Sequence, residues 1–199
     1  MPSRVTFISH APTSAQRLSA FPVDEPVEES ALFKLMAFHY PSPRFQQMFS
    51  APERRTQQTA EALNLITSPT DELRDVDFGS WRGRTLTDLH NEEPDGVVTW
   101  LTDPTAIPHG GESVAAFVRR IAAWLPSAGP GHTLAITHPA VIRAAVLHTL
   151  DAPLQAFWRI DIAPLTVTDL RYNGRMWTLR SMALPLSPGF KGEESVHTD

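Results

Sequence analysis

Two histidines stand directly after short apolar runs that are typical of buried strands. His10 follows residues 5–9, and His138 follows residues 133–137. Ligands of an open parallel sheet bind at the carboxyl ends of its strands, so both imidazoles are expected to face one crevice. A single histidine in such a place is usually a hydrogen-bonded turn residue. Two at matching places favour a functional site.

An arginine near an expected helix start supplies a third chemical group. Arg55 lies in the first turn of a helix that is predicted to begin after Ser50. A cation at a helix N-terminus opposes the helix dipole unless an anion occupies the site. Because guanidinium binds phosphate through paired hydrogen bonds, Arg55 beside two imidazoles indicates a phosphate site. The alternative is a solvated side chain on an exposed helix face, which is the interpretation of Arg54.

The helix that carries Arg55 has a clear start signal. Ser50 is a candidate N-cap, and Glu53, three residues later, completes a capping box. Pro52 suits the first turn. The helix is expected to run through Leu63.

The rest of the chain alternates expected strands and helices. Further strands are predicted at residues 47–51 and 73–78, and helices at 28–38, 112–125 and 139–150. Strands at 167–172 and 176–180 flank Asn173-Gly174, a strong hairpin signal. This alternation predicts an α/β layered fold with a mainly parallel sheet.

Composition argues against several classes of protein. A chain of 199 residues is long enough for one domain with a sizeable core. The net charge of -5 argues against a nucleic-acid partner, because phosphate-backbone binding needs a concentrated basic surface. The absence of cysteine excludes disulfides, thiol nucleophiles and cysteine-ligated metals. The apolar runs are too short for a signal peptide or a membrane span, so a soluble, cytoplasmic protein without a membrane partner is expected.

Six short segments form an ordered series of motifs. They are residues 7–13 (FISHAPT), 24–27 (DEPV), 50–60 (SAPERRTQQTA), 73–83 (LRDVDFGSWRG), 108–113 (PHGGES) and 137–143 (THPAVIR). In this order they resemble the motifs of the histidine phosphatase superfamily, in its phosphoglycerate-mutase-like branch 1. The resemblance covers roughly residues 5–180. It implies a three-layer α/β/α sandwich with a mainly parallel central sheet.

The resemblance also implies a metal-independent phosphomonoester hydrolase. His10 is implied as the nucleophile that forms a phosphohistidine intermediate, while Arg55 and His138 hold the non-bridging oxygens. Asp75 occupies the general-acid position and would protonate the leaving alcohol; Asp77, two residues on, is an alternative. No metal or cofactor is implied, because the arginine and the histidines supply the positive charge.

Four positions depart from the family pattern, and one of them is Asp75, a carboxylate one methylene shorter than the family's glutamate. Ser9 replaces the arginine of the first motif, so one of two phosphate-binding arginines is missing. Arg17, in the loop after the first strand, is the candidate replacement, and Ser9 stays among the expected phosphate-binding positions. Ala11 and Pro139 stand where the family has glycine, and proline has no N–H to offer a phosphate. These departures leave a second hypothesis open: a catalytically impaired, phosphatase-like binding or regulatory protein.

Two other enzyme classes are less favoured. A phosphoglycerate mutase would carry a longer insertion between Asp75 and Gly110, and a serine hydrolase would show a Gly-x-Ser-x-Gly elbow. The expected partner is a small phosphate ester, whose identity the sequence leaves open together with the oligomeric state. Residues 1–184 are expected to form one histidine-phosphatase-like domain, and residues 185–199 a flexible C-terminal tail.

Overall fold

The computed structural model describes residues 1–36 and 45–186, which build a mixed sheet between helices. The strands are β1 (Ser3–Ser9), β2 (Gln47–Ser50), β3 (Ser68–Pro69), β4 (Gly131–Thr137), β5 (Thr166–Tyr172) and β6 (Trp177–Pro185). Their order in the sheet is β3-β2-β4-β1-β5-β6. Only β5 runs against the direction of the other strands described. The prediction of a mainly parallel sheet is therefore confirmed.

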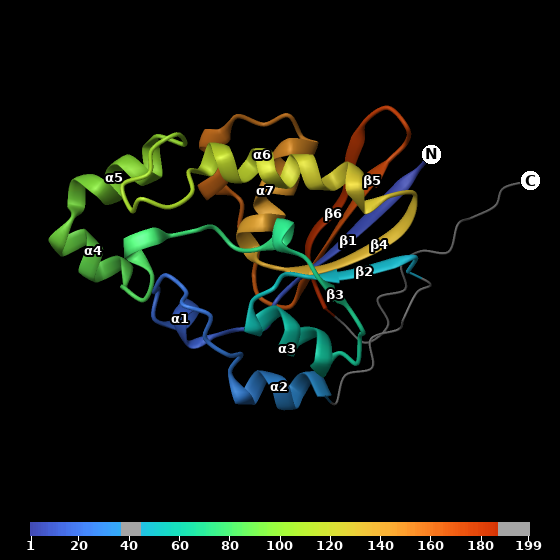
Figure 1. Cartoon of the computed structure of the whole chain (residues 1–199), viewed down its shortest axis with the longest axis horizontal. Coiled ribbons are helices and arrows are strands. Elements are labelled where there is room, and N and C mark those ends of the chain that lie inside the picture. Colours follow the sequence, from blue (N-terminus) through green and yellow to red (C-terminus); the bar gives the residue numbers. More distant parts are fainter. Residues whose placement is uncertain (37–44, 187–199) are drawn as a thin grey trace, which may run out of the picture.

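Helices cover both faces of this sheet, which makes three layers (Figure 1). One face carries α2 (Glu29–Met36) and α3 (Arg54–Ala62), and the other carries α6 (Val114–Trp124) and α7 (Pro139–Thr149). Two separate buried clusters correspond to these two faces. The expected three-layer α/β/α sandwich is confirmed.

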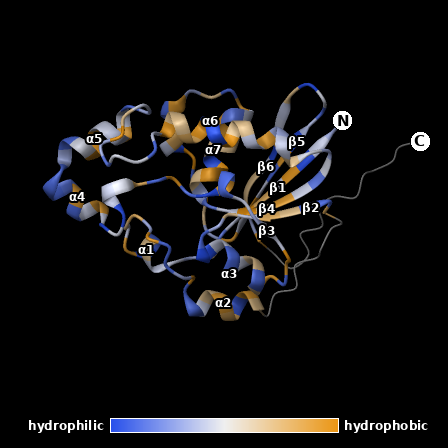
Figure 2. Ribbon diagram, viewed as in Figure 1, coloured by the Kyte–Doolittle hydropathy of each residue, from blue (hydrophilic) through white to orange (hydrophobic). Residues whose placement is uncertain are grey.

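Strand β1 shows why both faces must be covered. Val5 and Phe7 belong to the cluster beneath α6 and α7, whereas Ile8 belongs to the cluster beneath α2 and α3. Successive side chains of a strand point to opposite faces, so an apolar run is stable only when it is buried on both sides. Figure 2 shows hydrophobic colours gathered on the central strands and on parts of α6 and α7.

Further short elements extend the molecule beyond the carboxyl ends of the central strands (Figure 1). They are α1 (Ser14–Arg17), α4 (Leu86–Glu92), α5 (Pro94–Thr102) and the 3₁₀ turns Asp71–Leu73, Gly79–Trp81 and Leu154–Arg159, whereas the 3₁₀ turn Leu125–Ala128 leads into the start of β4. An aromatic cluster joins them: the ring of Phe21 lies 4.9 Å from that of Phe78 and 5.4 Å from those of Trp81 and Trp100. The loop after β1 is thus packed against α5 and the segment that follows β3.

Most predicted elements are confirmed in type, and one strand is wrong. The hairpin at Asn173-Gly174 joins β5 to β6, and the three predicted helices correspond to α2, α6 and α7. Of the predicted helix at 28–38, residues 37 and 38 lie outside the described residues. The predicted strand at 73–78 is a 3₁₀ turn followed by irregular backbone. Its apolar residues are buried, but side chains rather than a neighbouring strand hold its carbonyl groups.

The end of the domain lies slightly later than expected. Strand β6 continues through Pro185, and the Leu186 amide donates to the Leu165 carbonyl at 2.9 Å. Residues 187–199 of the expected tail lie outside the described residues. Across the part of the chain that the structure describes, no helix has the length and apolarity to cross a membrane.

A glycine contact beneath the loop at residues 75–78 gives a first prediction. A Cβ on Gly111 would stand 2.0 Å from the Asp77 carbonyl oxygen, so Gly111→Ala must push this loop away. We expect the variant to lose about 1–3 kcal/mol of unfolding free energy, which lowers Tm by roughly 2–10 °C. Thermal unfolding measures it. Gly96→Ala in α5, where the added Cβ meets only ordinary contacts, is the control; equal melting of both variants would contradict the prediction.

Candidate active site

Strands β1 and β4 place His10 and His138 side by side. Ser9 and Thr137 are paired residues at the ends of these parallel strands, and the His10 amide donates to the Thr137 carbonyl at 2.9 Å. The two rings meet edge to face with centroids 5.3 Å apart, and both are buried. Residues 128 positions apart in the chain therefore meet because their strands are neighbours in the sheet.

The backbone orients the ring of His10. Its Nδ1 lies 2.7 Å from the Ala11 carbonyl oxygen, so Nδ1–H donates and Nε2 keeps a lone pair. Burial lowers the pKa of His10 to about 3, and the positive charges of His138 and Arg55 add to this effect. The ring is accordingly neutral at ordinary pH, which is the state a nucleophilic imidazole requires.

A carboxylate bridges the arginine and the second histidine. The Asp75 Oδ2 atom lies 2.7 Å from Arg55 Nη2 and 3.5 Å from His138 Nδ1. Burial acts to raise the Asp75 pKa, but the charges of His138 and Arg55 and the Val76 amide outweigh it, so the pKa lies below its usual range. Asp75 is ionised in the free protein.

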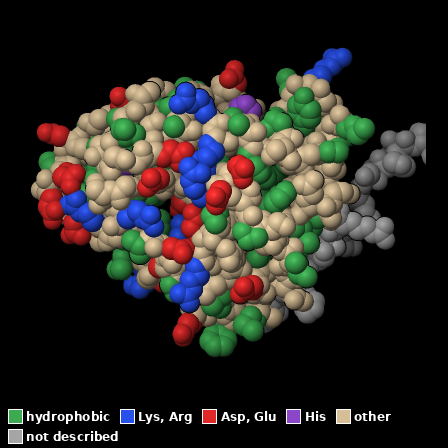
Figure 3. Space-filling view, viewed as in Figure 1, with side chains coloured by type: hydrophobic (Ala, Val, Ile, Leu, Met, Phe, Trp, Pro, Cys, Tyr) green, Lys and Arg blue, Asp and Glu red, His purple; other side chains and the backbone are tan. Residues whose placement is uncertain are grey.

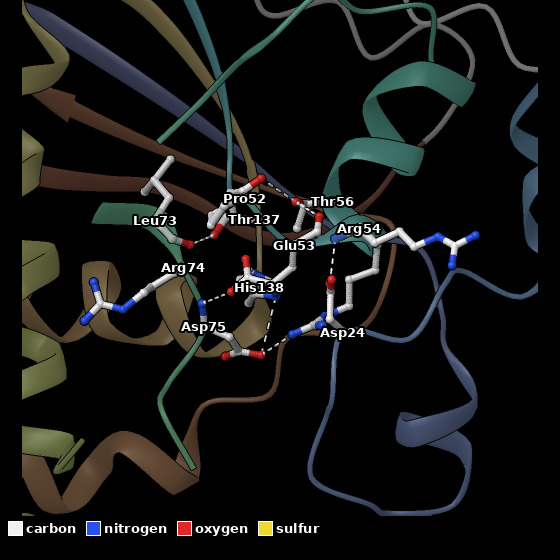
Figure 4. Close-up of polar contacts among 12 residues, drawn as sticks. Asp24, Pro52, Glu53, Arg54, Thr56, Leu73, Arg74, Asp75, Thr137 and His138 are labelled. Carbon is white, nitrogen blue, oxygen red and sulfur yellow. Dashed lines mark hydrogen bonds and ion pairs between the residues drawn. The ribbon is translucent and has the colours of Figure 1, made fainter. Parts of the chain in front are cut away.

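Glu53 has a different role from the one its sequence position predicted. The capping box is wrong: Ser50 ends β2 with a buried, unbonded hydroxyl, and α3 begins at Arg54. Three residues, Ala51, Pro52 and Glu53, separate the strand from the helix, so Ser50 is too early to cap it. The Glu53 carboxylate instead lies 2.8 Å from His138 Nε2 and accepts from the Asp75 amide at 3.0 Å (Figure 4).

The backbone around Asp75 is fixed by two neighbouring elements. Thr137 at the end of β4 donates its hydroxyl to the Leu73 carbonyl at 2.9 Å (Figure 4). Arg120 of α6 donates to the carbonyls of residues 72, 74 and 75 and pairs with Glu112 at 2.7 Å. The sequence did not single out Arg120. Its only signal was a cation beside an apolar helix face, and such a residue is usually interpreted as solvent-exposed.

Two buried donors of the site lack partners. Arg55 Nη1 and His138 Nδ1 form no hydrogen bond with the described residues. A buried polar group without a partner costs about 1–3 kcal/mol, so such groups mark places where a ligand completes the bonding. Pro139 and Ala140, in the first turn of α7, line the cavity that contains His10. The N-terminal end of this helix therefore adds a partial positive charge to the cavity. The arrangement is suited to an anion.

The cavity that contains His10 has a volume of about 230 Å³. Its charged residues are Glu25, Arg55, Asp75 and Arg143, and Phe78 and Ile162 are among its apolar ones. Arg143, which sequence reasoning missed, donates from Nε to the Ile160 carbonyl at 2.7 Å. Burial lowers its pKa, and the charges of Asp161 and Asp75 oppose this. The guanidinium is therefore within electrostatic reach of Asp75.

Of two predicted phosphate-binding residues, Arg17 lies outside the cavity and Ser9 is buried without a hydrogen bond from its hydroxyl to the described residues. Arg17 is exposed and pairs with Glu28 at 3.0 Å, and it is absent from the cavity lining. It sits at the end of α1, whose turn directs the side chain outward. Ser9 is fully buried, and its hydroxyl has no partner among the described residues.

Asp77 lies at a neighbouring, more polar hollow rather than beside His10. That hollow, about 280 Å³, shares Arg55 and Asp75 with the cavity of His10 and adds Asp77, Arg74 and Arg82. The Asp77 side chain accepts from the Gly79 amide at 3.0 Å. Figure 3 shows acidic and basic side chains gathered around a hollowed region of this face. In residues 1–36 and 45–186, no group of three or more metal-ligating side chains is clustered.

The arrangement of these residues agrees with a comparison of the sequence with known families. The profile of the histidine phosphatase superfamily (branch 1) matches residues 32–185. The chain belongs to this superfamily. Structure comparison gives the same fold: YhfR of Bacillus stearothermophilus superposes with a TM-score of 0.82 at 17% identity, covering 92% of this chain and 97% of that one. The α-ribazole phosphatase of Shigella flexneri gives 0.77 at 22% identity, covering 90% and 96%.

Curated members of the superfamily are more distant in sequence than in fold. Phosphoserine phosphatase 1 of Hydrogenobacter thermophilus is 27% identical over 134 residues, which are 63% of this chain and 64% of that protein. Glucosyl-3-phosphoglycerate phosphatase of Mycobacterium tuberculosis is 34% identical over 88 residues, or 41% and 40% of the two chains. The chain thus spans less than two thirds of the length of these relatives.

The buried neutral state of His10 predicts a pH dependence of stability. The unfolded chain binds a proton at this histidine below about pH 6.5, whereas the folded protein does so only near pH 3. Stability must therefore fall as pH drops through this window, by at most about 1.4 kcal/mol per pH unit from this group. Urea unfolding between pH 6 and 4 should show a shallower fall for His10→Gln. The exposed His90→Gln is the control, and parallel curves for His10→Gln and the parent would refute the assignment.

Proposed function

We propose that this histidine phosphatase hydrolyses phosphate monoesters of small metabolites through a phosphohistidine at His10. The observation that carries the proposal is the set of unpartnered donors, Arg55 Nη1 and His138 Nδ1, beside a neutral, buried imidazole. These are the groups that phosphoryl transfer requires: a nucleophile with a lone pair, and donors where negative charge accumulates.

The first step is attack of His10 Nε2 on phosphorus. A nitrogen–phosphorus bond forms as the bond from phosphorus to the ester oxygen breaks, and Nδ1–H remains bonded to the Ala11 carbonyl. Arg55 and His138 donate to the non-bridging oxygens. Water then attacks the phosphohistidine, the nitrogen–phosphorus bond breaks, and inorganic phosphate leaves. Two easier steps replace one difficult displacement.

Asp75 moves the proton that each step needs. It is ionised while Arg55 and His138 neutralise it, but a bound phosphate competes for the same two cations. That competition raises the Asp75 pKa, because two anions then share the site. A monoanionic ester brings the proton, Asp75 passes it to the leaving alcohol oxygen, and Asp75 next accepts a proton from the attacking water. Asp75, rather than Asp77, fills this role because it lines the cavity of His10.

Arg143 is the second cation of the proposed phosphate-binding cavity. The first-motif arginine is absent at Ser9, and Arg17 is paired with Glu28 outside the cavity. Arg143 reaches the cavity from the second turn of α7 and is oriented by its bond to the Ile160 carbonyl. It adds positive charge on the wall that the substrate must pass.

Substrate class and location follow from the same cavity and from the relatives. The similar proteins are named as phosphatases of phosphoserine, α-ribazole and glucosyl-3-phosphoglycerate. A cavity of about 230 Å³ fits a leaving group of metabolite size. We assign the protein to the cytoplasm and to small phosphate esters rather than to nucleic acid or membranes, which agrees with its net charge of -5.

The proposed activity is tested with p-nitrophenyl phosphate and a panel of small phosphate esters in the presence of EDTA. We expect turnover by the parent, loss of at least about 10³-fold in His10→Ala because the nucleophile is gone, and a trapped phosphoenzyme after rapid acid quench with labelled ester. Parent turnover equal to that of His10→Ala would refute the proposal. Phosphate binding without turnover or phosphoenzyme would favour the impaired, ligand-binding alternative.

The position of the second cation is tested with a matched pair of variants. Arg143→Gln should raise KM and the inhibition constant of inorganic phosphate by about 10-fold or more, which corresponds to ~1.4 kcal/mol. Arg17→Gln removes the same charge outside the cavity and should change both by less than twofold. The reverse result, with Arg17→Gln the more damaging variant, would restore Arg17 as the replacement for the missing arginine.

A further inference from the structure

The Glu53 carboxylate makes two contacts at the centre of the site, and neither serves the helix on which it stands. Its Oε2 lies 2.8 Å from His138 Nε2, and its Oε1 accepts the Asp75 amide at 3.0 Å. It stands at the N-cap of α3 but accepts no amide of that helix. Figure 4 shows it reaching from α3 to both His138 and Asp75.

These contacts determine where His138 carries its protons. A carboxylate at 2.8 Å accepts a proton from Nε2, so Nε2–H is present in every state. The other nitrogen, Nδ1, is buried without a hydrogen-bond partner and lies 3.5 Å from Asp75 Oδ2. Nδ1 is thus the ring nitrogen left for a ligand, and Arg55, whose Nη1 also lacks a hydrogen-bond partner among the described residues, contacts the same Asp75 oxygen.

Two carboxylates face the ring of His138. His138 is faced by Glu53 from α3 and by Asp75 from the loop, and Arg55 pairs with the same Asp75 oxygen. His10 contributes a neutral ring at 5.3 Å. With His138 charged, two cations balance two carboxylates in a buried cluster, which is the arrangement that burial of charge requires. Burial acts to raise the Glu53 pKa, yet the hydrogen bond and charge of His138 keep that pKa below its usual value.

We propose that Glu53 is a positioning residue that fixes Nε2–H of His138 and so holds the ring with Nδ1 towards the substrate phosphate. The proposal rests on the proposed phosphatase function. Glu53 touches no reacting atom; it acts by holding the imidazole that does, as carboxylates hold metal-binding histidines in other sites.

Glu53→Gln tests this directly. The side-chain amide of glutamine has one accepting oxygen, so it cannot accept hydrogen bonds from both His138 and the Asp75 amide with separate oxygens as the carboxylate does. A glutamine that still accepts the Asp75 amide must present its NH₂ group to His138, so Nε2 becomes the acceptor and the single proton moves to Nδ1. Long-range ¹H–¹⁵N spectra of the histidine rings read this change, with His138→Gln to assign the signal. We expect Nε2 to be protonated in the parent and unprotonated in Glu53→Gln.

The functional readout separates positioning from mere stability. Loss of the carboxylate that orients His138 should weaken inhibition by inorganic phosphate and lower kcat/KM by about 10- to 100-fold, the effect seen when carboxylates that orient metal-binding histidines are removed. Glu53→Asp, which retains a carboxylate, should recover part of both. Glu61→Gln, on the exposed side of the same helix, should match the parent.

Each outcome decides the proposal. Protonated Nε2 in Glu53→Gln would overturn it, and so would a tautomer change with unchanged phosphate inhibition. A lower melting temperature with parental kcat/KM would reduce Glu53 to a structural residue. If the parent hydrolyses no ester, the proposed function fails, while the NMR spectra and a titration with inorganic phosphate still test Glu53.

Discussion

The buried ion pair between Arg55 and Asp75 is the interaction on which the site depends. Its partners are 3% and 15% exposed at the side chain, and their atoms lie 2.7 Å apart. Burying charges is unfavourable unless each is paired and hydrogen-bonded. The Asp75 carboxylate meets this requirement through its contacts with Arg55, His138 and the Val76 amide. The pair holds the site together without a ligand, and it must loosen when an anion arrives.

The fold brings four segments that are distant in the sequence together around this ion pair. The ends of β1 and β4 supply the two imidazoles, the first turn of α3 supplies Arg55, and the segment after the 3₁₀ turn at residues 71–73 supplies Asp75. That segment belongs to no strand, so its position depends on Arg120, Thr137 and the close packing of Gly111. The regular elements thus fix His10, the proposed nucleophile, while side-chain contacts from both layers fix Asp75, the proposed acid.

The sequence predicts the parts of this arrangement that follow from periodicity and topology. Apolar runs directly before His10 and His138 indicate two buried strands, and the carboxyl ends of parallel strands lie at the same edge of a sheet. Directions of long side chains do not follow from spacing. Glu53 matches a capping box in sequence, yet its carboxylate bonds to His138 across the site. Arg17 is close to His10 in the chain but turns to Glu28, whereas Arg143 reaches the cavity from another helix.

The segment at 73–78 shows the same limit for the backbone. Leu73, Val76 and Phe78 are apolar and buried, which in sequence looks like an extended strand. A strand also needs a partner for its amides and carbonyls. Here the neighbours are side chains of α6 and β4 instead of a strand edge. A sequence pattern indicates which residues are buried. Which groups hydrogen-bond to the backbone of those residues is determined only by the assembled fold.

The loss of the first-motif arginine acquires a physical meaning from the charge balance. Arg55 and His138 lie against the carboxylates of Glu53 and Asp75, and Arg143 lines the wall of the cavity. An additional arginine at position 9 would give the cluster a standing positive charge that attracts phosphate outright. Without it, an anion that bonds to Nη1 of Arg55 shares this cation with Asp75, which holds Nη2. Anion binding then raises the pKa of Asp75. The arrival of the substrate itself thereby favours the protonated, neutral carboxyl that the proposed general acid needs.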